Sequence, residues 1–311
     1  MSNGQADVVK AHFEALGREI SPGMSLAHWR DVVEHYGDVT GEPGGVDYLE
    51  VEAAGVPALW VVPKGCAQDR VVLCLHGGGF ATCSIYTHRK MFAHLAKEMG
   101  VRALIPGFRR SPEHPHPAQV DDAVVVYRWL LEEGLAADRI AFAGDSAGGG
   151  LAVTAMLLAR AQGLPLPAAS MPLSPWVDME AGGESMVANR DKDALLNDAQ
   201  MTQTLIGMFL GEDGDVQDPY ANPLYADLTG LPPMYIQVGG DETLLDDARR
   251  LAEHARKAGV EARLDVFEGQ QHTFQLGAGR ASQADEAIRR LAGWARPKLG
   301  LQDDATAASG G

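Results

Sequence analysis

The feature that most constrains the fold is a serine flanked by glycines, in residues 144–149 (Gly-Asp-Ser-Ala-Gly-Gly). It follows the apolar run 140–143 and precedes a stretch of small and apolar residues, 151–161, that is typical of a buried helix. A strand, a tight turn and a helix in this order form a nucleophile elbow, which lifts the serine hydroxyl clear of a sheet. Side chains at the flanking glycine positions would crowd the turn. The pattern predicts an α/β fold with Ser146 as a nucleophile.

A second glycine-rich segment, residues 76–80 (His-Gly-Gly-Gly-Phe), follows the strand-like run 71–75. Consecutive glycines let backbone N–H groups approach a ligand, and acyl transfer needs such donors for the oxyanion of its tetrahedral intermediate. We predict that the N–H groups of Gly78, Gly79 and Ala147 form this oxyanion hole. The alternatives are a flexible turn or a phosphate-binding loop, but neither Gly-Lys-Ser/Thr nor a dinucleotide-type glycine fingerprint is present here.

A serine nucleophile needs a base, and the base needs a carboxylate that orients it, in the chain order serine, acid, histidine for this architecture. Only His254 and His272 follow Ser146 in the sequence. His254 lies in a charged amphipathic helix, predicted over 244–258, whereas His272 lies in a loop after the predicted strand 262–267. We therefore predict His272 as the base.

Four carboxylates compete for the role of the acid. Asp241 follows the predicted strand 234–239, and open α/β sheets assemble their sites at the carboxyl ends of the strands. Glu242 is its neighbour, while Asp246 and Asp247 fall in the next helix, whose dipole alone favours acidic residues in the first turn. We predict Asp241 as the acid, with Asp246 as the second choice.

From residue 71 onward, strand-like runs alternate with helical patterns, which indicates a mostly parallel sheet with helices on both faces. The expected strands are 71–75, 102–106, 139–144, 169–173, 234–239 and 262–267, and the expected helices are 87–99, 119–133, 147–161, 244–258 and 283–296. Two helices, 6–17 and 25–36, and a hairpin, 47–52 with 58–62, precede them.

The domain organisation follows from this alternation. We predict an α/β core in 46–175 and 232–299, an N-terminal helical cap segment in 1–45 and a disordered tail in 300–311. Residues 176–231 contain no predicted strand and are too long for a simple connection, so we expect an inserted cap segment.

The composition excludes several classes of partner. The chain has 311 residues, 46% of them hydrophobic and 22% charged, and a formal net charge of −16. That charge argues against nucleic acid or an anionic membrane as a partner. The sequence shows no secretory signal or transmembrane run. Cys66, Cys74 and Cys83 have no metal-site spacing, so we expect reduced thiols, a cytoplasmic location and no metal or cofactor.

Taken together, the motifs resemble the bacterial hormone-sensitive-lipase-like (family IV) esterases of the α/β-hydrolase fold, and most closely the esterase and ε-lactone hydrolase group. The resemblance covers about residues 71–294. It rests on the segments 76–80, 112–115, 117–118, 121–123, 144–149, 173–176, 218–219, 240–241 and 272–274. It implies that Ser146, Asp241 and His272 form the triad and that His76 is structural.

The chain departs from the family pattern in residues 108–113 (Phe-Arg-Arg-Ser-Pro-Glu), where the family often has Tyr-Arg-Leu-Ala-Pro-Glu. It also departs in residues 241–244 (Asp-Glu-Thr-Leu), where the family frequently has Asp-Pro-Leu. We expect Glu113 and Asp122 to hold loops near the oxyanion turn by hydrogen bonds. We interpret His114 and His116 as loop residues rather than metal ligands.

We predict a cofactor-independent carboxylester hydrolase for short- to medium-chain acyl esters, with a lactone hydrolase as the alternative. An amidase or peptidase and, from a different class, a non-enzymatic small-molecule receptor are the other hypotheses. The sequence leaves open the physiological substrate, the enantiopreference, the residues that line the acyl pocket and the oligomeric state, a homodimer included.

Overall fold

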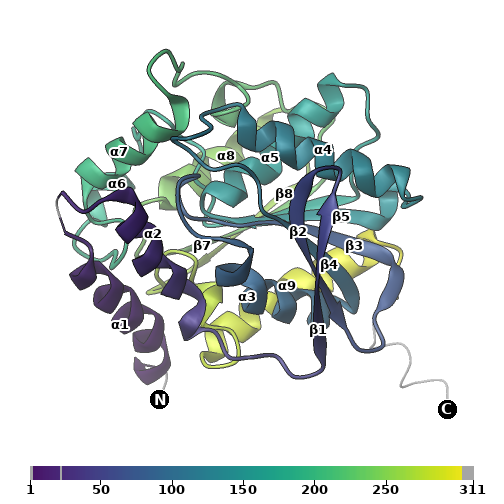
Figure 1. Ribbon diagram of the computed structural model, residues 1–311, viewed down its shortest axis with the longest axis horizontal. Helices are drawn as coiled ribbons and strands as arrows, with labels where there is room; N and C mark the ends of the chain where they lie inside the picture. Colours follow the sequence, from purple (N-terminus) through teal and green to yellow (C-terminus); the bar gives the residue numbers. More distant parts are fainter. Residues whose placement is uncertain (1–2, 22, 303–311) are drawn as a thin grey trace.

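Eight strands form one sheet in the order β1-β2-β4-β3-β5-β6-β7-β8 in the computed structural model, which describes residues 3–21 and 23–302 (Figure 1). β1 and β2 form an antiparallel hairpin, β2 is antiparallel to β4, and all other neighbours are parallel. The strands are β1 (Val46–Ala53), β2 (Val56–Pro63), β3 (Ala67–Leu75), β4 (Val101–Pro106), β5 (Ile140–Asp145), β6 (Ala169–Leu173), β7 (Met234–Gly239) and β8 (Ala262–Phe267).

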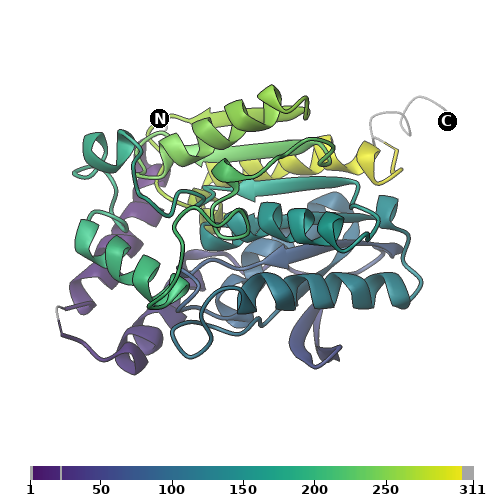
Figure 2. The ribbon, with the colours of Figure 1, turned by 90° about the horizontal axis from the view of Figure 1, so that it is seen from above.

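Helices cover both faces of this sheet, as Figure 2 shows from above. One face carries α3 (Ile85–Met99) and α9 (Ser282–Lys298), and the other carries α4 (Ala118–Glu132), α5 (Ala147–Ala161) and α8 (Leu245–Lys257). The prediction of an α/β-hydrolase fold with a mostly parallel, two-sided sheet is confirmed.

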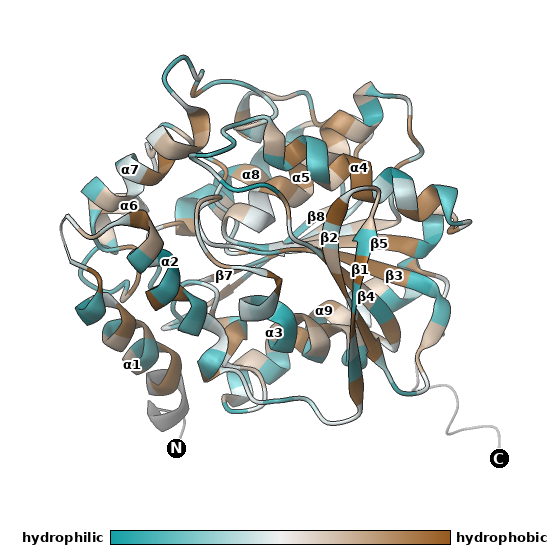
Figure 3. Ribbon diagram, viewed as in Figure 1, coloured by the Kyte–Doolittle hydropathy of each residue, from teal (hydrophilic) through white to brown (hydrophobic). Residues whose placement is uncertain are grey.

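The central strands are apolar on both sides because both sides are covered. In β3, Leu73 and Leu75 are buried in the core beneath α4 and α5, whereas Val72 and Cys74 are buried in the core beneath α3 and α9. Figure 3 shows the central strands mainly in the hydrophobic colour and the outer helices in both colours. This two-sided burial produces a rigid sheet whose carboxyl edge can position a site.

The remaining helices gather at one end of the molecule in Figure 1. They are α1 (Asn3–Glu19), α2 (Leu26–Val33), α6 (Ser185–Ala188) and α7 (Ala199–Leu210). The 3₁₀ helix η1 (Glu34–Val39) directly follows α2, whereas the 3₁₀ helix η3 (Pro223–Tyr225) contacts α5 and α8. The predicted helix 25–36 is wrong at its end, because the chain tightens into η1 after Val33. Residues 176–231 contain no strand, as expected.

Two short 3₁₀ helices, η2 (Ala137–Arg139) and η4 (Phe274–Gly277), complete the secondary structure of the described residues. The predicted disordered tail lies outside the described residues from position 303 onward. Among the helices in 3–21 and 23–302, none combines the length and the apolar character that crossing a bilayer requires.

Candidate active site

Ser146 forms the turn between β5 and α5 in a backbone conformation that non-glycine residues rarely adopt. Its φ is 55° and its ψ is −123°, and such strain persists only where surrounding contacts enforce it. Here the Ser146 N–H donates to the Leu173 carbonyl over 2.9 Å, and the Ser146 carbonyl accepts from the Trp176 N–H over 2.9 Å. The sheet and the following loop thus hold the predicted elbow.

The glycines on either side of Ser146 are required by close backbone packing. A Cβ on Gly144 would lie 2.1 Å from the Gly148 carbonyl oxygen, and one on Gly148 would lie 2.0 Å from the Leu75 carbonyl oxygen. Both distances are far below any real carbon–oxygen contact, so the steric reason inferred from the sequence is confirmed.

The glycine turn after β3 runs beside the elbow. Gly78 and Gly79 have φ values of +104° and +60°. Within the described part of the chain, the N–H groups of Gly78, Gly79 and Ala147 donate to no backbone or side-chain acceptor. Three unpaired N–H groups near one serine are a suitable arrangement for an anionic oxygen.

Asp145 joins the elbow to the glycine turn, a role that the sequence analysis did not single out. Its carboxylate is fully buried and accepts from the Gly77 N–H over 3.1 Å and from Nε2 of His88 over 3.0 Å. The only sequence signal was its place beside Ser146. His76, which we expected to be structural, stacks on Phe108 with ring centroids 4.3 Å apart. Burial lowers the pKa of His76 to about 3, so it is neutral.

His272 pairs with Glu242, so the prediction of Asp241 as the acid is wrong. Nδ1 of His272 lies 3.1 Å from Oε1 of Glu242, and the two residues are 1% and 0% exposed. The other carboxylate oxygen of Glu242 accepts from the Ser174 hydroxyl over 2.7 Å and from the Gly239 N–H over 2.8 Å.

The geometry of the turn after β7 explains the error. The Gly240 N–H donates to the Phe267 carbonyl and the Asp241 N–H donates to the Gln270 carbonyl, which keeps the segment alongside the chain that leaves β8. Along this turn Asp241 is partly exposed, whereas Glu242 is fully buried and contacts His272.

The other sequence candidates lie elsewhere. Asp246 accepts from the Ser185 N–H, and Asp247 accepts from the N–H groups of Val177 and Asp178. His254 on α8 bonds to the Ala226 carbonyl and does not line the cavity described next.

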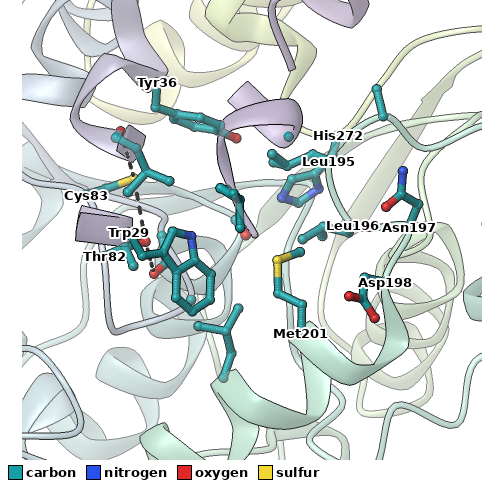
Figure 4. Close-up of a pocket in the computed structure, with 18 of the residues that line it drawn as sticks. Trp29, Tyr36, Thr82, Cys83, Leu195, Leu196, Asn197, Asp198, Met201 and His272 are labelled. Atoms are coloured by element: carbon teal, nitrogen blue, oxygen red, sulfur yellow. Dashed lines mark hydrogen bonds between the residues drawn. The ribbon is translucent and has the colours of Figure 1, made fainter. Parts of the chain in front are cut away.

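Ser146 and His272 line one cavity of about 420 Å³ together with Gly78 and Gly79. Figure 4 shows His272 opposite Tyr36 and Trp29 in this cavity. One wall comes from the N-terminal segment and the other from the segment after β6. The lining side chains from these two walls include Glu14, Arg18, Ile20, Trp29, Val33, Tyr36, Leu195, Leu196, Asn197, Asp198, Met201 and Leu205.

A second, much smaller cavity of about 30 Å³ also borders Ser146. It shares Gly79, Leu196 and Leu205 with the main cavity, and Trp176, Thr202 and Leu244 complete it. Among the apolar residues of α7, Leu205 lines both cavities, Ile206 and Phe209 are buried in the core, and Met208 packs against the core.

Charge affects the base in this enclosed site. Burial opposes the charged form of His272, but the negative charges of Glu242, Asp193 and Asp145, with Glu242 contributing most, together outweigh burial and raise the pKa of His272 above its ordinary value of 6.5. An imidazole with a raised pKa is a better proton acceptor, provided that the pH keeps it neutral.

Arginine–carboxylate pairs fix the loops behind the glycine turn, as we expected for Glu113 and Asp122. Arg30 on α2 contacts both carboxylate oxygens of Glu113 at 2.6 Å and donates to the Ala81 carbonyl at 2.8 Å and to the Ser111 carbonyl at 3.0 Å. Asp122 binds the side chain and the N–H of Arg109. No sequence signal pointed to Arg30.

One of the two histidines near this loop, His116, pairs with a carboxylate. His116 lies 3.1 Å from the Asp218 carboxylate. Among the described residues no group of three His, Cys, Asp or Glu side chains is arranged to hold a metal ion. The three cysteines are buried and unpaired.

The two-sided parallel sheet, the strained serine at the end of β5 and the histidine–carboxylate pair define an α/β hydrolase. In agreement, residues 72–276 match a family described as having the alpha/beta hydrolase fold. An acetyl-hydrolase of Streptomyces hygroscopicus is 40% identical over 255 residues, which cover 82% of each chain. An esterase of Acinetobacter venetianus is 33% identical and covers 80% of this chain and 82% of its own.

A crystal structure of an esterase from the bacterial hormone-sensitive lipase family superimposes with a TM-score of 0.92. It is 40% identical in sequence, and the superposition covers 96% of this chain and 100% of that one. The chain belongs to the α/β-hydrolase family and, within it, to the hormone-sensitive-lipase-like carboxylester hydrolases.

Proposed function

We propose that Ser146, His272 and Glu242 form the catalytic triad of this carboxylester hydrolase and that the N–H groups of Gly78, Gly79 and Ala147 form its oxyanion hole. The observation that carries the proposal is that Ser146 and His272 line the same cavity, and that His272 is held by a buried carboxylate.

The reaction follows from these positions. The Ser146 hydroxyl attacks the ester carbonyl carbon while its proton passes to Nε2 of His272, and the carbonyl oxygen becomes an oxyanion that the N–H groups stabilise. His272 then gives the proton to the leaving alcohol as the C–O bond breaks, which leaves an acyl group on Ser146. Water attacks this acyl group, gives its proton to His272 and releases the acid as the proton returns to Ser146.

Glu242 contributes by fixing the tautomer of the base. Its carboxylate accepts the Nδ1–H of His272, so that Nε2 carries the lone pair facing the serine. The same negative charge stabilises the imidazolium that forms when the proton is transferred.

We further propose that the substrates are short- to medium-chain acyl esters and that the segments 1–45 and 176–231 act as a cap. Both segments contribute walls to the main cavity, and its volume is typical of small-molecule sites. The small cavity beside Ser146 has room for only a few heavy atoms, which suits a short group on one side of the ester bond. The names of relatives such as the Streptomyces acetyl-hydrolase agree with a small acyl group.

A fluorophosphonate probe and a series of p-nitrophenyl esters test this proposal. We expect the probe to label Ser146 alone, as mapped by peptide mass spectrometry, and Ser146→Ala to lose labelling and turnover. Turnover by wild type should peak at short or medium acyl chains. Labelling at another residue, or a folded Ser146→Ala variant with ordinary turnover, would contradict the triad. A maximum at dodecanoyl or longer chains would contradict the substrate range, and faster ring opening of matched lactones would favour the lactone hydrolase.

A further inference from the structure

A buried carboxylate in the segment after β6 joins two parts of the site that are distant in sequence. Asp193 is 2% exposed. Its Oδ2 accepts from the N–H and the hydroxyl of Thr243 over 2.8 Å and 3.0 Å, and its Oδ1 accepts from the N–H groups of Leu195 and Leu196 over 2.9 Å and 2.8 Å. Thr243 directly follows Glu242, and Leu195 and Leu196 line the main cavity.

The chemistry of these four bonds requires a carboxylate at this position. All four partners donate, and an ionised carboxylate offers two oxygens that only accept. Hydrogen bonds to a charged acceptor are about twice as strong as neutral ones. An amide in the same place would turn its NH₂ group toward two donors, so either the Thr243 side or the Leu195–Leu196 side would lose its bonds.

Two neighbouring contacts show that the same segment is fastened to the turn of the acid and to the loop of the base. Asn189 donates from Nδ2 to the carbonyls of Gly240 and Glu242, over 3.0 Å and 2.9 Å. Gln271, which precedes the base, accepts from the Ala194 N–H over 2.8 Å. In the chain, Asp193 lies between Asn189 and Ala194, which make these two contacts. Of the three side chains involved, those of Asn189, Asp193 and Gln271, only that of Asp193 is charged.

We propose that Asp193 is a positioning residue for hydrolysis. Its single carboxylate fixes both the position of Glu242, through Thr243, and the position of the cavity wall formed by Leu195 and Leu196. This inference rests on the proposed triad, because it assigns Asp193 its effect through Glu242 and His272. The wall that contacts the substrate and the acid that orients the base are then held in one fixed relation. A substrate that displaces the wall would also disturb the acid.

Asp193→Asn is the direct test, and Asp178→Asn is its matched control. Asp178 is a second buried carboxylate of the same segment; it accepts from the N–H groups of Glu180 and Gly182 and pairs with Arg250, but it lines neither cavity. Both variants should unfold at a lower temperature. At a temperature where each is fully folded, we expect kcat of Asp193→Asn to fall about tenfold to hundredfold, with a raised KM, and kcat of Asp178→Asn to stay close to wild type.

The pH profile separates a positioning role from a merely structural one. The carboxylates that act on His272 are Glu242, Asp193 and Asp145, and each of them favours the protonated, positively charged form of His272. Loss of the Asp193 charge should therefore move the acidic limb of kcat/KM to lower pH, which Asp178→Asn should not do. Thr243→Val, which removes one of the four bonds and keeps the shape of the side chain, should give a smaller change of kcat.

The outcomes are distinct. A folded Asp193→Asn variant whose kcat, KM and acidic limb all match wild type would overturn the proposal, as would equal losses of kcat in Asp193→Asn and Asp178→Asn. If Asp193→Asn does not fold, an unchanged kcat in folded Thr243→Val overturns it, and a reduced one supports it. Failure of the fluorophosphonate to label Ser146 in wild type would instead refute the proposed triad.

Discussion

Replacing Glu242 by glutamine should nearly abolish turnover, whereas replacing its neighbour Asp241 by asparagine should not. Two donors, the Ser174 hydroxyl and the Gly239 N–H, already point at one oxygen of Glu242. A glutamine would therefore place its amide oxygen toward them and its NH₂ group toward Nδ1 of His272. The histidine would then take the tautomer with its proton on Nε2, which cannot accept the serine proton.

The size of the loss follows from this tautomer argument. An aspartate-to-asparagine change that traps the wrong tautomer in a serine protease lowers kcat about 10⁴-fold, and such a factor corresponds to about 5 kcal/mol of activation free energy. Because Glu242 and His272 are both buried, water cannot substitute for the lost carboxylate. We expect a loss of this order for Glu242→Gln and a change of less than about threefold for Asp241→Asn, as for ordinary surface positions.

Steady-state hydrolysis of p-nitrophenyl acetate over a range of pH is the assay. The base must be neutral, and Glu242 raises the pKa of His272, so kcat/KM of wild type should fall as the pH drops through a value above 6.5. In Glu242→Gln the imidazolium loses this stabilisation, and the acidic limb of the residual activity should move to lower pH. Thermal unfolding of both variants controls for folding. A large loss in Asp241→Asn with little change in Glu242→Gln would refute the reasoning.

Two further predictions concern the cavity wall and the loop behind the glycine turn. Leu205→Ala should join the two cavities and shift the ester preference to longer acyl chains. Leu210 is about equally buried on the same helix but lines neither cavity, so Leu210→Ala should leave the preference unchanged, and each variant should lose ~2 kcal/mol of unfolding free energy. An equal shift of the ester preference in both variants would contradict the role of Leu205 in the cavity wall. Arg30→Ala should lower kcat severalfold because it releases the Glu113 loop and the glycine turn. The control is Arg89→Ala, which breaks a two-bond pair with Glu42 away from the site and should leave kcat unchanged in the same ester assay. Equal kcat values for the two arginine variants would show that the contacts of Arg30 do not position the turn.

The sequence alone determined those features whose physical cause lies within a few consecutive residues. The elbow is one, because its strand, turn and helix follow one another directly and a side chain at Gly144 would collide with the backbone of Gly148 in the same unit. The two-sided parallel sheet is another, because burial on both faces makes the central strands mainly apolar. His272 was found by chain order and by its place after the last strand.

The tertiary structure decided what depends on the register between distant segments. Which of two adjacent carboxylates meets His272 was set by backbone bonds that hold the turn after β7 against the chain leaving β8, and no local pattern distinguishes Asp241 from Glu242. The contacts of Arg30, and those between Asp193 and Thr243, likewise join residues about fifty or more positions apart. Side-chain direction at such places follows from packing between elements, so only the folded chain reveals it.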